Sequence, residues 1–217
     1  MTATTTGLKL YGIARSRAMR NLWLLAELGI PFEHVKIVQT YNKTLPDEVT
    51  SRDPEFLAVN PNGRIPALTD GDVTIWESMA INLYLSRKYD GPLSPVDLGE
   101  EGQMTMWSFW ATNECESHAI TIHESSMARN EGWQQTQKAQ AAIENLDAPF
   151  SVMEKALSKT GYLVGSRFTV ADINTAVVIF YARNASELFK RYPSVGKWYA
   201  AVTARPHFQS VMKMREA

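Results

Sequence analysis

The spacing of apolar positions changes along the first part of the chain and predicts alternating strands and helices. Short apolar runs bounded by turn-forming residues are typical of strands, whereas apolar residues three and four positions apart are typical of helices. On this basis we predict strands at 8–12, 32–38, 67–68 and 73–76, and helices at 16–28, 54–59 and 79–89. The resulting order is βαβ followed by ββα, which indicates a small α/β domain.

Beyond residue 98 the pattern changes to long amphipathic stretches, and we expect no strand there. The spacing predicts helices at 100–127, 133–157, 169–181 and 194–204, with a last short helix after Arg205-Pro206. Pro149 could kink or divide the second of these helices. Residues 90–95 have the composition of a linker. We therefore predict an α/β domain at 1–89, a linker at 90–98 and an all-helical bundle domain at 99–217.

Composition and charge narrow the classes of function. The 217 residues include 22 basic and 23 acidic side chains, so no basic excess favours nucleic acid or anionic lipid as a partner. No run of about 18 apolar residues predicts a membrane span, and the N-terminus lacks the basic-then-apolar form of a secretory signal. We expect a cytoplasmic protein with no nucleic-acid and no membrane partner.

The cysteine and histidine residues do not predict a nucleophile or a metal site. Cys115 is the single cysteine, and its neighbours Glu114 and Glu116 disfavour a thiolate. Only His118 and His123 lie close in sequence among the histidines, and their spacing fits a metal site on one helix face poorly. We therefore predict no metal.

The run from Asn60 to Leu68 and the pair Glu77-Ser78 are the most informative part of the chain. Pro66 opens a strand-like segment, and an X-Pro bond is the one bond for which the cis form is cheap, so we expect Ile65-Pro66 to be cis. The backbone of Ile65 would then be free to pair with an extended peptide. Ser78 at a helix start can hold an anion, and Glu77 can hold an amine. Together these features suit a small peptide with an amino-acid end.

Four motifs in this order resemble the cytosolic glutathione S-transferases, and they span nearly the whole chain. They are Tyr11-Gly12-Ile13-Ala14-Arg15-Ser16, Asn60-Pro61 with Ile65-Pro66-Ala67-Leu68, Glu77-Ser78, and Thr169-Val170-Ala171-Asp172. The resemblance implies a thioredoxin-like N-terminal domain, an all-helical C-terminal domain and glutathione as co-substrate. The last motif has the form of a capping box and is expected to start a buried helix rather than to serve catalysis.

The resemblance to the serine-type members implies that Ser16 activates the glutathione thiol. A free thiol has a pKa of about 8.5, and a hydroxyl donor near a helix start lowers it by favouring the thiolate. From its position alone, Ser16 is better interpreted as a helix N-cap. Arg15 is the second candidate for assisting the thiolate, whereas Arg17 and Arg20 are better interpreted as a solvated or ion-paired face.

The resemblance also implies how glutathione is held. Ser78 would bind the γ-glutamyl carboxylate, Glu77 its amine, and the backbone of Ile65, set by Pro66, would pair with the cysteine. Arg52 and Arg64 match positions that hold glutathione carboxylates or carbonyls, although glutamine is usual at the position of Arg64. Without the resemblance, Glu77 and Ser78 are ordinary helix-start residues and both arginines are surface charges.

In this family the long helix that opens the second domain lines the pocket for a hydrophobic electrophile. The residues on its early face are Trp107, Trp110, Ala111, Glu114 and His118. Aromatic residues at helical spacing belong more often to a core or an interface than to a site. The resemblance implies a homodimer that conjugates glutathione to electrophiles in detoxification. A glutathione-dependent peroxidase, disulfide reductase, isomerase or dehalogenase, or a non-catalytic glutathione-binding regulatory protein, remains an alternative.

Overall fold

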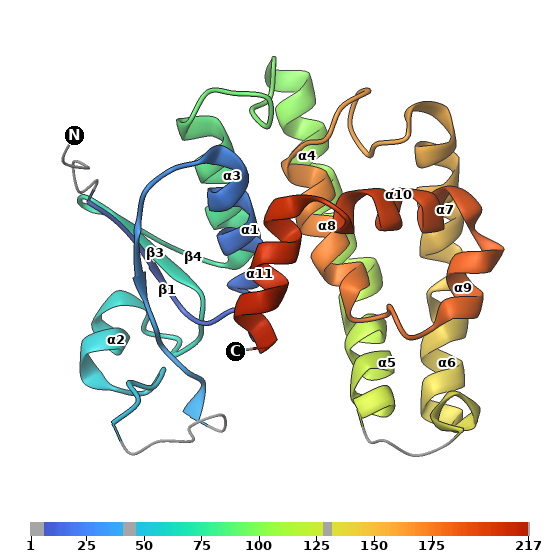
Figure 1. Cartoon of the computed structure of the whole chain (residues 1–217), viewed down its shortest axis with the longest axis horizontal. Coiled ribbons are helices and arrows are strands. Elements are labelled where there is room, and N and C mark those ends of the chain that lie inside the picture. Colours follow the sequence, from blue (N-terminus) through green and yellow to red (C-terminus); the bar gives the residue numbers. More distant parts are fainter. Residues whose placement is uncertain (1–6, 41–46, 128–131, 217) are drawn as a thin grey trace. The chain divides into compact units, whose positions relative to one another are not determined.

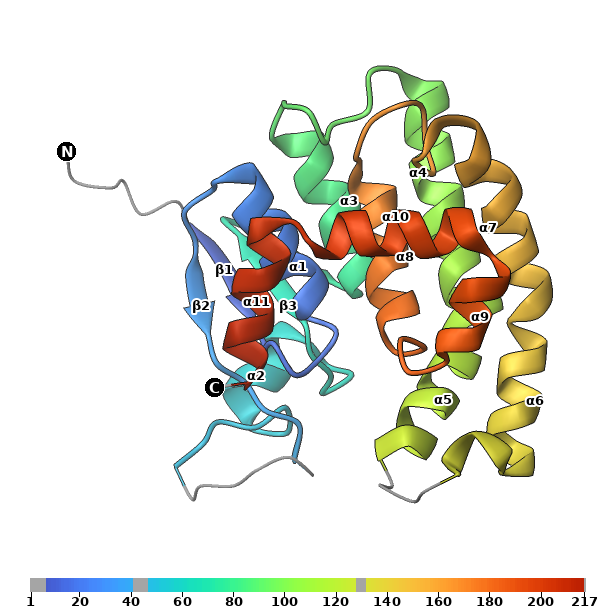
Figure 2. The same ribbon diagram turned by 45° about the vertical axis from the view of Figure 1, so that its right-hand side comes forward.

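The computed structural model describes residues 7–40, 47–127 and 132–216, and the chain folds into two units. The first unit contains Met1–Gly91 together with Pro206–Ala217, and the second contains Pro92–Arg205. Figures 1 and 2 show the ribbon from two sides. The chain therefore returns to its first unit after it has completed the second.

The first unit is built on a mixed sheet, as the apolar pattern predicts. Its strands are β1 Leu8–Tyr11, β2 Glu33–Val35, β3 Ala67–Asp70 and β4 Val73–Trp76, in the spatial order β2-β1-β3-β4. β2 is parallel to β1, whereas β3 is antiparallel to both of its neighbours, β1 and β4. The helices of this unit among residues 7–40 and 47–91 are α1 Met19–Leu28, α2 Pro54–Val59 and α3 Ser78–Lys88. The thioredoxin-like half of the predicted fold is confirmed.

Leucine and tryptophan side chains from the strands and α1 form the core of this unit. Leu8, Leu10, Leu68 and Trp23 have no exposed surface. Their complete removal from water is the main favourable contribution to the stability of the sheet and its helices. β2 is shorter than predicted, because the chain beyond Val35 leaves β1 and next forms an isolated bridge farther along.

The last helix, α11 Pro206–Glu216, belongs to the first unit, whereas the sequence pattern assigned residues 99–217 to the helical domain. Figures 1 and 2 both show α11 beside α1. The ring of Phe208 meets Trp23 edge-on at 4.8 Å between centroids, and Arg215 Nη1 donates to the carbonyl of Ala14 over 3.0 Å. These contacts connect residues about two hundred positions apart, which the spacing of apolar residues along one segment does not reveal.

The second unit is helical throughout its described residues, which confirms the other half of the predicted fold. Its elements are α4 Leu98–Trp110, the π-helical turn Ala111–Glu116, α5 Ser117–Met127, a 3-10 turn Trp133–Gln135, α6 Gln137–Asn145, α7 Asp147–Thr160, α8 Val170–Phe180, α9 Ser186–Arg191 and α10 Pro193–Thr203. The predicted helix at 100–127 is thus continuous apart from its π-helical turn. α9 is short and was not predicted.

The predicted helix at 133–157 is divided, and Pro149 explains where. Leu146 ends α6 and precedes α7, so Pro149 lies in the first turn of α7. A proline is tolerated there because the amide it lacks has no partner inside the helix in any case. The break therefore falls three residues before the proline rather than at it.

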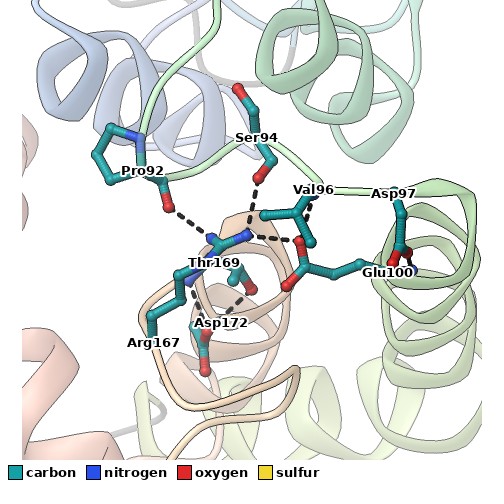
Figure 3. Close-up of polar contacts among 8 residues, drawn as sticks. All are labelled: Pro92, Ser94, Val96, Asp97, Glu100, Arg167, Thr169 and Asp172. Carbon is teal, nitrogen blue, oxygen red and sulfur yellow. Dashed lines mark hydrogen bonds and ion pairs between the residues drawn. The ribbon is translucent and has the colours of Figure 1, made fainter.

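The start of the helical unit is held by Arg167, as Figure 3 shows. Its guanidinium donates to the carbonyls of Pro92 and Ser94 over 2.6 and 2.8 Å and pairs with Glu100. A planar guanidinium can satisfy several acceptors at once. Two carbonyls of the predicted linker are thereby satisfied by one side chain of the helical unit.

Candidate functional site

Ser16 lies in the loop between β1 and α1, three residues before the first residue of α1. Its hydroxyl donates to the carbonyl of Ile13 over 2.7 Å and accepts from the amide of Ala18 over 3.1 Å. The N-cap position of α1 is held by Ala18, so the interpretation of Ser16 as the N-cap is wrong. Ser16 instead shapes the turn that leads into the helix, and it is half-buried.

Arg15 is exposed and has a partner on the last helix of the same unit. Its Nε donates to the carbonyl of Arg215 over 2.8 Å, while Arg215 donates in return to the loop at Ala14. This exchange fixes the loop that carries Ser16 against the end of α11. Arg15 therefore has a positioning role in the structure in addition to any effect of its charge.

The loop before β3 is organised by the side chain of Asn60. Its Nδ2 donates to the carbonyl of Arg64 over 2.6 Å, and its Oδ1 accepts from the amide of Asn62 over 3.1 Å. Gly63 adopts a φ of 58°, and a Cβ at this position would lie 2.8 Å from Nη1 of Arg52. Glycine is thus required both for the backbone conformation and for the approach of Arg52. Arg52 and Arg64 are both exposed.

Ile65 and Pro66 follow this loop, and both are buried. The Ile65-Pro66 bond is cis, as predicted. β3 begins only at Ala67, so the backbone of Ile65 lies outside the ladder between β1 and β3. A Cβ added to Gly12 would lie 2.9 Å from Ala18 and 3.4 Å from Ile65. The absence of a side chain at Gly12 therefore brings the Ser16 loop and Ile65 close together.

Glu77 joins β4 to α3 with a backbone conformation that is uncommon for a residue with a side chain. Its φ is 71°, and it is the one non-glycine residue with a positive φ among those described. Such conformations cost about 1–3 kcal/mol and concentrate at functional sites. The Glu77 side chain is exposed and makes no capping hydrogen bond to α3. Because Glu77 provides no side-chain cap, the positive end of this eleven-residue helix, at Ser78, can attract an anion.

Arg20 is a residue of this site that sequence reasoning missed. It was interpreted as part of a solvated or ion-paired face, yet it is only 2% exposed and its Nη1 donates to Ser78 Oγ over 2.8 Å. A signal was present, because Arg20 and Asn21 interrupt an otherwise apolar run from Ala18 to Leu25. A charged side chain in such a run is buried only with polar partners.

The five residues predicted to meet an electrophile differ in their exposure within the helical unit. Ala111 is completely buried and Trp107 almost so, whereas Trp110 and His118 are half-buried and Glu114 is exposed. The rings of Trp107 and Trp110 meet nearly perpendicularly at 5.0 Å. The structure therefore places Ala111 and Trp107 in the core of the unit and leaves Trp110, Glu114 and His118 accessible.

Cys115 is also buried in the helical unit, in the π-helical turn. Burial, with a smaller contribution from the charge of Glu114, raises the pKa of its thiol to about 12. A thiol of this kind stays protonated at neutral pH and is a poor nucleophile. Within residues 7–40, 47–127 and 132–216 no three potential metal-ligating side chains gather, and no helix is long and apolar enough to cross a membrane.

Comparison with known proteins identifies the family. The chain matches the glutathione S-transferase N-terminal domain over residues 6–87 and the glutathione S-transferase C-terminal domain over residues 116–206. It is 32% identical to glutathione S-transferase 3 of Zea mays, over 94% of this chain and 93% of that protein. The chain belongs to the glutathione S-transferase family.

Solved structures of glutathione S-transferases have the same fold. Glutathione transferase F7 of Populus trichocarpa superimposes with a TM-score of 0.80 at 27% identity, covering 96% of this chain and 99% of that one. Glutathione S-transferase-I, solved with lactoylglutathione bound, gives a TM-score of 0.79 at 27% identity with the same coverage. The family relationship extends over both units of the chain, in agreement with the resemblance seen in the sequence.

Proposed function

We propose that this protein is a serine-type glutathione transferase that conjugates glutathione to a hydrophobic electrophile. The sulfur of the glutathione thiolate attacks an electrophilic carbon, forming a carbon–sulfur bond, while the electron pair of the broken bond leaves with the departing group. The thiol proton is released to solvent before the attack. The protein raises the fraction of thiolate and holds it near the electrophile, so that its contributions are pKa lowering and proximity.

The observation that carries this proposal is the open start of α3 beside the strained Glu77. The positive end of α3 and the Ser78 hydroxyl suit the γ-glutamyl carboxylate, and the exposed Glu77 carboxylate suits the adjacent amine. The backbone of Ile65, outside the sheet ladder and set by Pro66, suits the cysteine of the peptide. Arg52 and Arg64, at the loop before β3, contribute positive charge for the glycine carboxylate.

Ser16 is the residue proposed to stabilise the thiolate. Its hydroxyl proton is directed at the Ile13 carbonyl, so it must rotate toward the sulfur when glutathione binds. A hydroxyl rotates freely about its C–O bond, and an anionic sulfur is a stronger acceptor than a neutral carbonyl. Arg15 adds a permanent positive charge next to Ser16 while its Nε holds the end of α11.

Replacement of the Ser16 hydroxyl tests this role. Ser16→Ala is expected to lower kcat by about one to three orders of magnitude and to raise the apparent pKa of bound glutathione, because a hydrogen bond to an anion is worth about 1.5–3 kcal/mol. Ser16→Thr keeps the hydroxyl and should retain most of the rate. The measurements are pH–rate profiles at saturating glutathione and an ultraviolet titration of the bound thiolate. An unchanged profile in Ser16→Ala would transfer the role to Arg15.

The electrophile is proposed to contact Trp110, Glu114 and His118, supported by their exposure, with Trp107 and Ala111 as the buried support of that helix face. Assays with aryl halides, hydroperoxides, mixed disulfides and haloalkanes separate conjugation from the other glutathione-dependent reactions. Tight glutathione binding without turnover on any of these classes would favour a regulatory binding protein instead.

The protein is proposed to act as a cytoplasmic homodimer in detoxification. Each unit presents large apolar side chains to solvent, including Val73 and Trp76 on β4 and Met106 and Phe109 on α4, which are 41–63% exposed. Exposed apolar side chains in such numbers are typical of an interface. Phe109→Asp should give monomers in sedimentation velocity, whereas Val152→Asp on α7, also an exposed apolar position, should leave the oligomeric state unchanged.

A further inference from the structure

A buried network of polar side chains connects α1 to the first turn of α3. Arg20 Nη1 donates to Ser78 Oγ over 2.8 Å, and Asn21 Nδ2 donates to the Ser78 carbonyl over 2.8 Å and to Asn82 Oδ1 over 2.7 Å. Asn82 Nδ2 donates back to the Arg20 carbonyl over 3.2 Å. All four residues are at least 96% buried.

The chemistry of the guanidinium group determines what the Ser78 hydroxyl can do. Arginine has only donors, so the Ser78 oxygen must act as the acceptor in their hydrogen bond. A hydroxyl has one proton and two lone pairs, and its own proton is then left to donate elsewhere. A serine hydroxyl can either donate or accept a hydrogen bond. By donating to the Ser78 oxygen, Arg20 leaves the Ser78 proton to be donated to another group.

The position of the charge leads to the same conclusion. The N-terminus of α3 already carries the positive end of the helix dipole, and Arg20 adds a full positive charge next to it. Both positive centres favour an anion at the start of α3. Linking α1 to α3 does not by itself need a charge, because Asn21 and Asn82 already link them through neutral hydrogen bonds.

We propose that Arg20 is a positioning residue for glutathione, which acts through Ser78 by directing its hydroxyl proton toward the γ-glutamyl carboxylate. The inference rests on the proposed function, since it assumes that this carboxylate binds at the start of α3. Arg20 is then selective for one group of the ligand. It contributes to binding of a peptide that has the carboxylate and contributes little to one that lacks it.

The experiment compares two thiols that differ only in that carboxylate, glutathione and γ-aminobutyryl-cysteinylglycine. Their dissociation constants are measured by calorimetry for the wild type, Arg20→Met, Arg20→Lys and the control Arg17→Met, an exposed arginine of the turn just before α1. Arg20→Met should weaken glutathione binding by roughly tenfold to a hundredfold. The same variant should change binding of the analogue by less than about twofold, and kcat at saturating glutathione should be retained.

Arg20→Lys keeps the charge and donors and is expected to lose less glutathione affinity than Arg20→Met. If Arg20→Met does not fold, the proposal is tested with Arg20→Lys. The quantity compared is then the ratio of its dissociation constants for glutathione and for the analogue. Equal losses with both thiols, or no loss with glutathione, would overturn the proposal and make Arg20 a structural link only. Failure of the wild type to bind glutathione would instead overturn the proposed function, so the two failures are distinguishable.

Discussion

Two helices of this protein begin in opposite ways. At the start of α8, Thr169 and Asp172 form a complete capping box, and the Asp172 carboxylate accepts further bonds from the Leu163 amide and from Trp198 Nε1 over 3.2 and 2.8 Å. At the start of α3, Glu77 has a positive φ and provides no cap. The first helix start has a completely buried acceptor of its own, whereas the second has no side-chain cap.

The difference shows what separates a helix start that serves stability from a helix start that serves ligand binding. Both starts have the same unsatisfied amides and the same end of the helix dipole. Asp172 satisfies these donors within the chain, so α8 gains stability and offers nothing to a ligand. The exposed Glu77 side chain provides no cap for α3, so the positive end of this helix can attract an anion from outside, and a bound ligand can offset the cost of the Glu77 backbone conformation.

Removal of the Asp172 carboxylate should give the largest effect, confined to stability. Burial raises the pKa of this carboxyl, while hydrogen bonds from Thr169, Trp198 and Leu163 oppose that rise. Asp172→Ala leaves these buried donors without their acceptor and should lower the free energy of unfolding by about 3–5 kcal/mol. Urea unfolding of the variant and the wild type measures this loss of free energy. A large loss of glutathione affinity in the folded fraction would contradict the assignment of this helix start to structure alone.

Glu77→Gln should give the next largest effect, and it should appear in binding. Loss of the charge opposite the glutathione amine is expected to raise KM for glutathione roughly tenfold to a hundredfold with little change in kcat. Unfolding in the absence of ligand should be nearly unchanged, because the side chain is exposed. Thermal unfolding with and without glutathione checks both points, since the ligand-induced rise in Tm should shrink in the variant. A lower kcat at saturating glutathione would mean that Glu77 acts on chemistry.

Ser78→Ala should moderately affect both glutathione binding and the free energy of unfolding. The KM for glutathione should rise less than in Glu77→Gln, because the Ser78 amide still faces the carboxylate. The variant also removes the acceptor of Arg20, so the free energy of unfolding should fall by about 1–3 kcal/mol. Steady-state kinetics together with urea unfolding separate the two effects. Stability equal to the wild type would show that Arg20 finds another acceptor.

Glu77→Gly should change stability only slightly, and it is the most direct test of the comparison. Glycine adopts a φ of 71° without the penalty that a side chain incurs, so the free energy of unfolding should rise by roughly 1 kcal/mol. Glutathione affinity should fall as in Glu77→Gln. The matched change Thr169→Gly at α8 should lower stability, because it removes a capping hydroxyl. A Glu77→Gly variant less stable than wild type would show that the open start of α3 is not strained.

Local signals predicted much of this fold and site. The Thr169–Asp172 capping box, the two strands at 67–68 and 73–76 and the Asn60–Pro66 loop were recognisable because each depends on residues close in sequence. Burial of Arg20 and the packing of α11 on α1 were missed, because both depend on partners more than fifty positions away. The local partners of Ser16 were also missed, since a serine before a helix has several equivalent ways to use its hydroxyl.

The return of α11 to the first unit has a consequence for biosynthesis. Residues 206–216 leave the ribosome only after the whole helical unit. During synthesis the first unit therefore lacks α11 until the chain is nearly finished. Until then the face of α1 that carries Trp23 lacks Phe208 and is open to water or to a chaperone. A chain interrupted before Pro206 would keep that apolar face uncovered, which would mark the incomplete product for retention or degradation.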